Sequence, residues 1–564
     1  MWTVSTSPMT RRRASATNAR QQGEAMKNEG LTRRGFLSLG AISAAALAGT
    51  GLAGCAQPKP ASERVDKIET INCSGIVVDP SQVTETIKAD IVVLGGGMSG
   101  LSAAVQATEN GDDVILLEAQ SALGGNGQGV EGTLGVGTKW QQEKGIDVDC
   151  AVIMQEELGK AQWVPNGLFY KDLVDRSAAN LEWAVETCGC ELNGLIDNYP
   201  MGVVEGAVDT FHWWKDGAAY VGYIQPMEKH LRKLGASIDL NTRALEFSYA
   251  DDGSVDGVYA LDAFGDLVKY QAKAVIVATG GFANDDERLK KYGFDLDTLE
   301  RIGTPGHYGD GINMVLAAGA REYTGVCYLK YNRIGHSKIA AFGPFWSAMC
   351  FGGPFLWVNE DCERFVDEGC MYRVGNIITQ STPMHAQPHC TCLSIFDQEV
   401  FDAQLQENAE LAEEWGVDIA AEWKEIVDGK DDAFQANSIE ELAEQAGVEV
   451  QALKKAVDEY NAMCEAGRDD VFGKDAKFLK PIKTAPFYLA RIHEVMEGPL
   501  GGVTIDRTFR PVLNDGGRLE NVFVIGLDSM MLYRDVYPID VPGSASAECI
   551  NGGRTAANQA HELL

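Results

Sequence analysis

The chain has 564 residues, of which 45% are hydrophobic, enough to bury a large core and to form more than one domain. It carries 81 acidic against 48 basic residues, a formal net charge of -33 that repels nucleic-acid phosphates and anionic lipid surfaces. Nucleic acid is therefore not an expected partner, and most carboxylates are expected on a solvated surface.

The first 55 residues predict an export signal that is separate from the fold. The segment TRRGFL, residues 32–37, has the paired arginines of a twin-arginine signal, and an alanine-rich apolar stretch follows from Leu37 to Ala53. That stretch is too short and too rich in small residues for a stable membrane span. Because the twin-arginine route exports folded proteins with their cofactors in place, the signal favours a redox enzyme.

The end of the apolar stretch predicts a lipid anchor. Leu52-Ala53-Gly54-Cys55 is typical of a lipobox, in which the cysteine receives the lipid and becomes the mature N-terminus. An ordinary signal-peptidase site near Ala56 is the alternative. A start at Met26 instead of Met1 also stays open. We expect a cell-envelope protein, held by its lipid on the outer face of the cytoplasmic membrane.

The 13 cysteines form no Cys-x-x-Cys pair of the kind that binds zinc or haem. Cys188 and Cys190, and likewise Cys390 and Cys392, are separated by a single residue, a spacing that suits neither a metal nor an unstrained disulfide. We therefore expect buried thiols at these positions and no metal site.

The strongest local signal begins at a buried strand, Ile91–Leu94, which is followed by glycines spaced G-x-G-x-x-G, a helix and a second strand. Gly95 permits a tight turn, Gly97 lets the backbone approach a pyrophosphate, and Gly100 allows the helix to pack on the strand. Glu118, 23 residues beyond the first glycine, can accept both ribose hydroxyls of an adenosine. With the helix N-terminus facing the phosphates, this succession predicts a dinucleotide site.

The segments that follow favour FAD over NAD. Gly124-Gly125-Asn126 and the glycine-rich residues 127–137 bring backbone close to a flat ring, whereas a nicotinamide dehydrogenase would continue with regular βα units. Residues 274–281, a buried strand that ends in glycines, predict a second approach to the same adenine nucleotide. We expect one non-covalent FAD in an α/β fold with a Rossmann-like FAD-binding domain.

From residue 88 to residue 564 the chain resembles the fumarate reductase/succinate dehydrogenase flavoprotein family. The matching segments, in family order, are GxGxxG, GGN, ATGGF (278–282), GDG (309–311), VNEDCERFVDE (358–368), VDEYNAMCEAGRDDVFGK (457–474), PFY (486–488), GGVTID (501–506) and PGSASAECINGGRTAA (542–557). The resemblance implies the following domains: a signal at 1–55, a linker at 56–86, an FAD-binding domain from 87–325 and 485–564, and an inserted α+β capping domain at 326–484.

The family pattern also implies which residues surround the flavin. Asp528, in VIGLD, would lie on the ribityl or ribose side, and the backbone of Ser544 and Ala545 near the pyrimidine ring. The complete expected set is Gly95, Gly97, Ser99, Gly100, Glu118, Ala119, Gly124, Gly125, Asn126, Gly132, Ala244, Thr279, Gly280, Asp310, Asp528, Ser544 and Ala545.

The substrate side departs from the fumarate reductases. Those enzymes hold two carboxylates with a histidine just before the GGV segment and an arginine before the terminal glycine, and the matching positions here are Gly498 and Asp540. An upstream histidine is also replaced, near Tyr331 and Asn332. Since Asp540 would repel a carboxylate where the family has an arginine, a C4 dicarboxylate is disfavoured.

The segment RFVDEGCMYRVGN, residues 364–376, supplies the expected proton donor. The fumarate reductase acid is an arginine four residues after the glutamate, a position that is Tyr372 here, with Arg373 next to it. Ketosteroid dehydrogenases of the same family are similar in having a tyrosine there and another in a C-terminal TYPG segment, matched imperfectly by Tyr537.

Reduction of an activated C=C bond needs hydride from flavin N5, a proton at the neighbouring carbon and a donor to the activating carbonyl. We expect Tyr372 or Arg373 to deliver the proton, because the cation would stabilise a phenolate. Tyr537 is expected to polarise the carbonyl or to help close the pocket. A packed ring beside the flavin is the alternative for Tyr537.

Three further sets of residues have either a structural or a functional role. Asp367 and Glu368 are expected mainly to orient Arg373 rather than to transfer protons. The aromatic residues of DTFHWWKDG, residues 209–217, either line an apolar substrate pocket or pack in the core. His307, beside the GDG segment, is expected to be structural.

The sequence has no haem, iron–sulfur or second flavin motif, so electrons are expected from a separate cytochrome or flavoprotein. We expect the chain to reduce a small organic acceptor in anaerobic respiration, by analogy with exported reductases of the family. Two alternatives stay open: a ketosteroid-type dehydrogenase that oxidises its substrate, and a non-catalytic flavoprotein that carries electrons. The long capping segment argues against the second.

Overall fold

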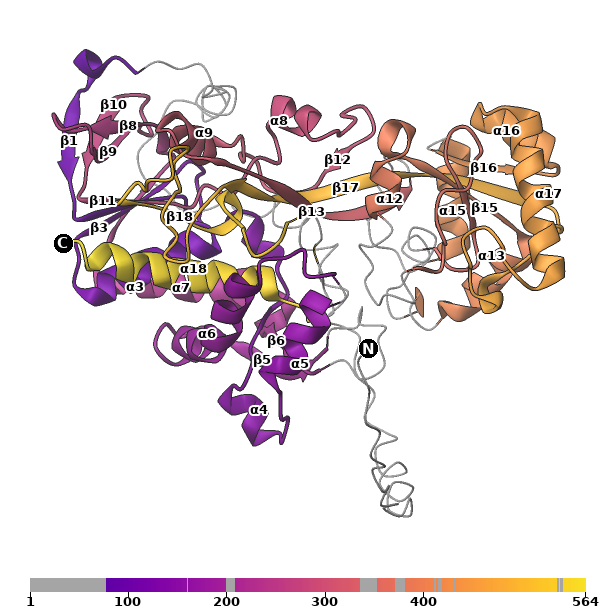
Figure 1. Cartoon of the computed structure of the whole chain (residues 1–564), viewed down its shortest axis with the longest axis horizontal. Helices are drawn as coiled ribbons and strands as arrows, with labels where there is room; N and C mark the ends of the chain where they lie inside the picture. Colours follow the sequence, from indigo (N-terminus) through magenta and orange to yellow (C-terminus); the bar gives the residue numbers. More distant parts are fainter. Residues whose placement is uncertain are drawn as a thin grey trace, which may run out of the picture.

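The computed structural model describes residues 78–159, 161–198, 208–334, 352–370, 381–409, 412–413, 418–429, 432–534, 537 and 541–564, without the side chains of residues 324–334, 381 and 497. A first body contains residues 78–321 and 504–564, and a second body contains residues 352–486. The long strands β13 (Glu322–Ile334) and β17 (Phe487–Val503) connect them (Figure 1). The predicted signal lies outside the described residues.

The first body is built on a five-stranded parallel sheet of order β18-β11-β2-β3-β7. Its strands, in chain order, are β2 (Ile91–Leu94), β3 (Val114–Glu118), β7 (Ser237–Leu240), β11 (Ala274–Val277) and β18 (Val522–Val524). The strands β2, β3, β11 and β18 are wholly buried, and apart from Glu118 at the end of β3 all their residues are apolar. This pattern is expected when both faces of a parallel sheet are covered. This sheet confirms the predicted Rossmann-like α/β fold.

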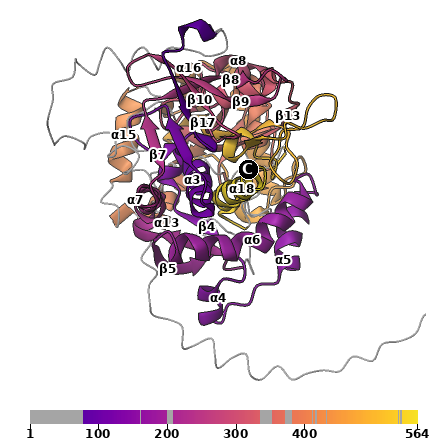
Figure 2. The same cartoon turned by 90° about the vertical axis from the view of Figure 1, so that its left-hand side faces the viewer.

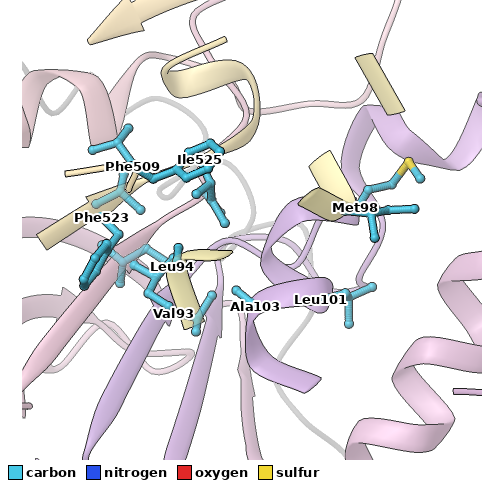
Figure 3. Packing of buried hydrophobic residues seen from close by; sticks show 14 of the residues in the cluster. Val93, Leu94, Met98, Leu101, Ala103, Phe509, Phe523 and Ile525 are labelled. Carbon is cyan, nitrogen blue, oxygen red and sulfur yellow. The ribbon is translucent and has the colours of Figure 1, made fainter. Parts of the chain in front are cut away.

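Three helices lie on one face of this sheet: α3 (Met98–Asn110), α7 (Gln225–Leu234) and α18 (Ser544–His561) (Figures 1 and 2). Helix α18 packs closely on α3, since a Cβ on Gly553 would lie 2.5 Å from the carbonyl oxygen of Ser99. Figure 3 shows the apolar core here, where Leu94 of β2 packs near Phe523 of β18. The C-terminal helix therefore belongs to the nucleotide-binding layer.

Two smaller sheets extend the first body. One has the order β1-β10-β9-β8, with β1 (Glu85–Lys88), β10 (Leu267–Gln271), β9 (Val255–Leu261) and β8 (Arg243–Tyr249). The other has the order β4-β6-β5, with β4 (Gly132–Leu134), β6 (Phe211–Trp214) and β5 (Leu192–Asp197). The remaining helices are α4 (Lys139–Glu143), α5 (Cys150–Met154), α6 (Gly167–Glu186), α8 (Asp286–Lys291) and α9 (Asp310–Ala317).

The second body shares a sheet with the connecting strands, of order β12-β17-β15-β14, in which β13 and β16 also pair with β17 and the edge strand β12 comes from the first body. The new strands are β12 (Glu300–Arg301), β14 (Leu356–Val358), β15 (Cys392–Asp397) and β16 (Ala433–Ala436), and the helices are α12 (Ser381–His385), α13 (Gln398–Glu407), α15 (Ile419–Gly429), α16 (Ile439–Ala446) and α17 (Val450–Ala466). Trp357 joins one apolar cluster, whereas its neighbours Leu356 and Val358 join another, so both faces of the sheet are buried.

The predicted domain limits fall at the connecting strands. Residue 326 lies inside β13, and residue 484 lies just before β17. β13 and β17 pair as antiparallel strands from Glu322 with Val503 to Ile334 with Ile492. Within the described ranges, no helix has the length and apolar character that a bilayer span requires.

Candidate active site

The loop between β2 and α3 is shaped by the three predicted glycines. Gly95 has a φ of +101°, and a Cβ there would lie 2.2 Å from the carbonyl oxygen of Ala278. A Cβ on Gly100 would lie 1.9 Å from the carbonyl oxygen of Gly95. At Gly97, in contrast, the nearest atom to a Cβ is 3.8 Å away, so the protein leaves room for a ligand. Helix α3 starts there without a side-chain cap, which suits a pyrophosphate at its N-terminus.

Glu118 ends β3, where its carboxylate meets this loop. One oxygen accepts the N–H of Gly96 and the other accepts the N–H of Gln120, each at 2.7 Å. Burial raises the pKa of Glu118, and the backbone donors offset part of that shift. Each carboxylate oxygen has a further lone pair, so the group can also accept ribose hydroxyls. Ala119 follows, half-buried.

The start of β8 places Ala244 and Asp310 near Glu118, at the end of strand β3. The N–H of Thr242 donates to the carbonyl of Glu118 at 2.8 Å. Ala244 is buried, and the guanidinium of its neighbour Arg243 donates two bonds to Asp310, at 2.7 and 2.8 Å. Asp310 is therefore paired with a cation, which the sequence analysis did not anticipate.

Asp528 is fully buried and forms hydrogen bonds with the ATGG segment, residues 278–281. Its carboxylate accepts bonds from the N–H and the hydroxyl of Thr279, and from the N–H of Gly281 at 2.8 Å. Gly280, between these donors, has a φ of +89°, a conformation that favours glycine. Burial raises the pKa of Asp528 to about 6. The structure thus brings Thr279, Gly280 and Asp528 together.

The GGN segment crosses the glycine loop. The N–H of Gly124 donates to the carbonyl of Gly96 at 2.9 Å, and both Gly124 and Gly125 have positive φ. The side-chain oxygen of Asn126 accepts the N–H and the hydroxyl of Thr304, at 2.8 and 3.0 Å. Residues 124–126 thus present mainly backbone to the site, as the close approach of a flat ring requires.

His307 links the GGN and ATGG segments. Its Nε2 lies 3.0 Å from the Thr304 hydroxyl, and its Nδ1 lies 2.9 Å from the carbonyl oxygen of Gly280. Burial lowers the pKa of His307, so the ring is neutral at pH 7. These bonds give His307 a positioning role beside the expected flavin segments, in line with the structural role predicted for it.

Helix α18 reaches this site with its N-terminus. Gly543 precedes it without a side-chain cap, as Gly97 does for α3, and Ala545 is half-buried in its first turn. The Ser546 hydroxyl donates to the carbonyl of Gly132 at 2.9 Å, which joins α18 to β4. Ser99, on the first turn of α3, is buried near Gly526.

An aromatic pair connects Tyr537 to the start of α18. The hydroxyl groups of Tyr533 and Ser544 lie 2.7 Å apart. The ring of Tyr537 packs edge-on against Tyr533, with ring centroids 4.7 Å apart and an interplanar angle of 84°. Tyr537 is 9% exposed, so this contact supports the packing alternative. The sequence analysis missed Tyr533, which lies four residues before Tyr537.

Glu157 was also missed. It is fully buried in a π-helical turn, Gln155–Gly159, a local distortion frequent at functional sites. One carboxylate oxygen accepts the hydroxyl of Tyr170 at 2.9 Å, and the other accepts the N–H of Val541. The side chain therefore tethers the segment that follows Asp540. No motif marks Glu157 among the many acidic residues of the chain.

Tyr372, Arg373 and Asp540 lie outside the described residues, but the start of the RFVDE segment does not. Glu368 is fully buried and accepts two bonds from Arg364, at 3.0 and 2.8 Å. Lys474 Nζ lies 3.5 Å from the same carboxylate. The role predicted for Glu368, to orient Arg373, stays a prediction.

Gly498 lies in β17, and the nearest described atoms around it are uncharged. A Cβ there would lie 3.2 Å from Cδ1 of Leu527 and 3.9 Å from Nδ2 of Asn126. Backbone pairing places Leu329 opposite Gly498 on β13. Neither of these two atoms, the ones that the described residues bring within 4 Å, is charged, and glycine itself offers no cation to a carboxylate.

The aromatic segment DTFHWWKDG packs in the core. Residues 211–214 are all buried in β6. Trp213 donates to Asp197 at 3.0 Å, and Nε2 of His212 lies 2.9 Å from the Thr138 hydroxyl. Burial lowers the pKa of His212 to about 4, so its ring is neutral at pH 7. The structure favours packing over a substrate pocket. Cys188, Cys190, Cys390 and Cys392 are buried free thiols, as predicted.

Residues 90–539 match the family model described as FAD binding domain. The chain belongs to this FAD-binding family. Its cofactor is FAD, and the glycine loop, the open space at Gly97 and the two helix N-termini without side-chain caps fit that nucleotide. The chain is an FAD-dependent oxidoreductase.

Curated relatives of this flavoprotein include the vinyl phenol reductase of Lactiplantibacillus plantarum, 27% identical over 84% of this chain and 97% of the relative. NADH:fumarate oxidoreductase of Klebsiella pneumoniae is 28% identical over 75% of the chain and 42% of the relative. NADH:acrylate oxidoreductase of Vibrio harveyi is 26% identical over 86% and 51%. The chain thus spans about half the length of the latter two.

Two solved structures share the fold of this flavoprotein. The open conformation of a flavocytochrome c3 fumarate reductase has a TM-score of 0.62 and 21% identity, over 90% of this chain and 85% of that chain. The 3-ketosteroid-Δ4-(5α)-dehydrogenase from Rhodococcus jostii RHA1 has a TM-score of 0.62 and 21% identity, over 86% and 99%. The chain thus shares its fold with a fumarate reductase and with a ketosteroid dehydrogenase, the two groups that its sequence resembles.

Proposed function

We propose that this flavoprotein reduces an activated C=C bond in a small organic acceptor other than a C4 dicarboxylate. The observation that carries the proposal is glycine at position 498, where the fumarate reductases have a histidine, and the two described atoms that a Cβ there would meet within 4 Å carry no charge. The sequence adds Asp540 at the second clamp position. Vinyl phenol reductase, the relative covered over almost its whole length, makes conjugated aryl alkenes the first acceptors to try.

The chain's own residues divide the work as follows. The loop at Gly97, the carboxylate of Glu118 and the Asp528 site would hold the nucleotide. When bound, the flavin supplies a hydride at N5. Tyr372 or Arg373 delivers the proton to the neighbouring carbon, and the buried Arg364–Glu368 pair anchors the segment that carries them. Tyr537 shapes the pocket through its packing on Tyr533.

Partners and location belong to the same proposal. An export signal of twin-arginine type and the cysteine of LAGC would place the enzyme on the outer face of the cytoplasmic membrane. A separate cytochrome or flavoprotein would then supply electrons, as in anaerobic respiration. Fractionation of cells that express the wild-type chain and a Cys55→Ala variant tests the anchor: the variant is expected in the soluble envelope fraction.

The test of the activity is anaerobic oxidation of reduced methyl viologen by the FAD-loaded chain. Acceptors are 4-vinylphenol, aryl acrylates, urocanate, 3-keto-enone steroids and fumarate. We expect turnover with a conjugated non-dicarboxylate acceptor and none above background with fumarate. Fumarate as the preferred acceptor would contradict the proposal, and so would a flavin that is reduced and reoxidised without turnover of any alkene.

The proton donor is tested on the acceptor that turns over. Tyr372→Phe and Arg373→Lys are compared with Arg468→Lys, a change at an exposed side chain. We expect one of the first two to lower kcat by ~100-fold or more, because general acid catalysis contributes ~100–10,000-fold. Near-full turnover by both would place the proton donor elsewhere.

A further inference from the structure

A cluster of three different side chains lies at the junction of the two bodies, apart from the residues assigned to the flavin. One ring nitrogen of His385, the sulfur of Cys390 and one carboxylate oxygen of Glu494 all lie within 4.8 Å of one another. His385 ends α12, and Cys390 ends the 3-10 turn Pro388–Cys390. Glu494 comes from β17, the strand that connects the bodies (Figure 1). The cluster therefore joins the capping segment to the connecting strand.

The ring of His385 is held between two acceptors. Nδ1 lies 2.9 Å from Oε2 of Glu494, and Nε2 lies 3.2 Å from the carbonyl oxygen of Tyr292. In the protonated ring both nitrogens donate, one to Glu494 and one to this carbonyl, whereas the neutral ring that keeps Nε2–H has a lone pair on Nδ1 that can bind a metal. A metal bound by Nδ1 and by the Glu494 carboxylate would replace the hydrogen bond between them. A backbone carbonyl that fixes the tautomer is also the usual outer partner of a metal-binding histidine.

The turn that carries Cys390 is strained. His389 and Cys390 have φ values of +57° and +52°, a region that side chains other than glycine rarely adopt. Backbone strain of this kind persists where the surroundings enforce it, and it gathers at binding sites. Here it holds the thiol of Cys390 3.4 Å from the carbonyl of His385 and 3.5 Å from that of Gly293.

A pocket of about 580 Å³ opens beside the cluster. Its lining includes Gly293, Phe294, His385, His389 and Cys390. Glu494 and Cys390 are buried, whereas the side chain of His385 is 20% exposed. The pocket thus gives an ion a path to the cluster and gives a fourth ligand, such as water, a place to bind.

We propose that His385, Cys390 and Glu494 bind one zinc ion that fastens the capping segment to β17. Imidazole nitrogen, thiolate sulfur and carboxylate oxygen are the ligands that zinc prefers, and three protein ligands leave one position open. Binding takes the thiolate form of Cys390, and its proton passes to solvent. Cys390 lies five residues after His385, and Glu494 lies 104 residues after Cys390, so spacing alone does not reveal the site.

A second group of the same composition provides an internal control. Glu109, Cys188 and His230 also lie within 4.8 Å of one another. There the carboxylate of Glu109 accepts a bond from Trp183 at 2.8 Å. Burial also raises the pKa of Cys188 far above its usual value, which disfavours the thiolate that a metal needs. We expect no zinc at this second group.

The test measures zinc in the full-length, FAD-loaded chain after equilibration with zinc and removal of free metal. We expect about one zinc per chain in the wild type and in Cys188→Ser, and at least ~10-fold less in Cys390→Ser and His385→Asn. Equal zinc in the wild type and Cys390→Ser would overturn the proposal. So would a wild-type chain without stoichiometric zinc, or loss of zinc in Cys188→Ser alone.

A second measurement separates loss of zinc from loss of fold. Each variant is scored for bound FAD, and Glu494→Gln replaces any variant that lacks it. In the wild type a chelator is expected to lower the midpoint of thermal unfolding, because a ligand that binds only the folded state stabilises it. The FAD-loaded Cys390→Ser or Glu494→Gln variant should not respond. An equal chelator effect in wild type and variant would place the metal elsewhere.

Discussion

Buried carboxylates are held in different ways in the two bodies. In the first body Glu118 and Asp528 accept backbone N–H groups, and burial raises the pKa of each. In the second body Glu368 and Asp469 share the guanidinium of Arg364. Burial alone would raise the pKa of Asp469, but Arg364 and backbone donors lower it below its usual value.

The difference follows from what each body has to hold. Donors on a backbone loop leave a carboxylate with lone pairs for a ligand, so Glu118 can also accept the hydroxyl groups of a nucleotide. A carboxylate bound to a guanidinium has its charge compensated and is suited to fix a segment in place. Glu368 and Asp469 thus act as anchors through their ion pairs, whereas Glu118 and Asp528 keep lone pairs for a ligand.

The largest effect is expected from Arg364→Met. This change leaves Glu368 and Asp469, both fully buried, without their guanidinium. Removing one partner of a buried pair costs ~3–5 kcal/mol of unfolding free energy. Arg468→Met is the matched control, because Arg468 pairs with Asp470 at an exposed site and should change stability by less than ~1 kcal/mol. The unfolding free energy of both FAD-loaded variants is measured by denaturant titration. An equal loss in the two variants would contradict the anchoring role of Arg364.

Glu548 extends the comparison to α18. It is buried and accepts a bond from Asn551 at 2.8 Å, and burial raises its pKa to about 8 from a usual 4.5. Between these values the folded state keeps a proton that the unfolded state has lost, so stability falls as pH rises through the window. From pH 6.5 to 8 the fall is on the order of 2 kcal/mol.

Glu548→Gln should remove this part of the pH dependence. Asp528, with a pKa of about 6, titrates mostly below pH 6.5 and therefore contributes little to the difference between the variants. The control is Glu562→Gln, at an exposed position at the end of α18. Unfolding free energies of wild type and variants at several pH values measure the effect. Parallel curves for wild type and Glu548→Gln would show that Glu548 is charged in the folded state.

Gly97→Ala separates folding from FAD binding. Gly97 has an ordinary φ of -76°, and a Cβ there meets only Gly124 O, at 3.8 Å, so the chain without FAD should lose less than ~0.5 kcal/mol. The methyl group would occupy the space for the pyrophosphate, and we expect the Kd of FAD to rise by ~10-fold or more. Gly429→Ala, where a Cβ meets nothing within 4 Å, is the control. Unchanged affinity would mean that the pyrophosphate lies elsewhere.

The glycine loop and the βαβ unit that the sequence predicted are present in the fold because each of their features is local, and the contacts of these residues with FAD stay a prediction. The turn at Gly95, the helix behind it and the carboxylate of Glu118 occur within one βαβ unit, where spacing reports geometry. Glu157 and Tyr533 were missed because their roles depend on partners at Val541 and Ser544, which only the fold brings near. The zinc proposal has the same origin, since Glu494 lies far along the chain from its partners.

The smallest effect is expected from Tyr537→Phe. The substitution keeps the ring that packs edge-on against Tyr533 and removes only the hydroxyl. If Tyr537 shapes the pocket by packing, kcat should change by less than ~3-fold, whereas Tyr537→Ala should lose the ring contact and cost more. A fall of ~100-fold or more in the phenylalanine variant would instead assign the hydroxyl to polarisation of the substrate carbonyl. Because Tyr533 connects this ring to Ser544, FAD content is measured alongside kcat. A variant with full FAD and reduced kcat then reports on the substrate rather than on the cofactor.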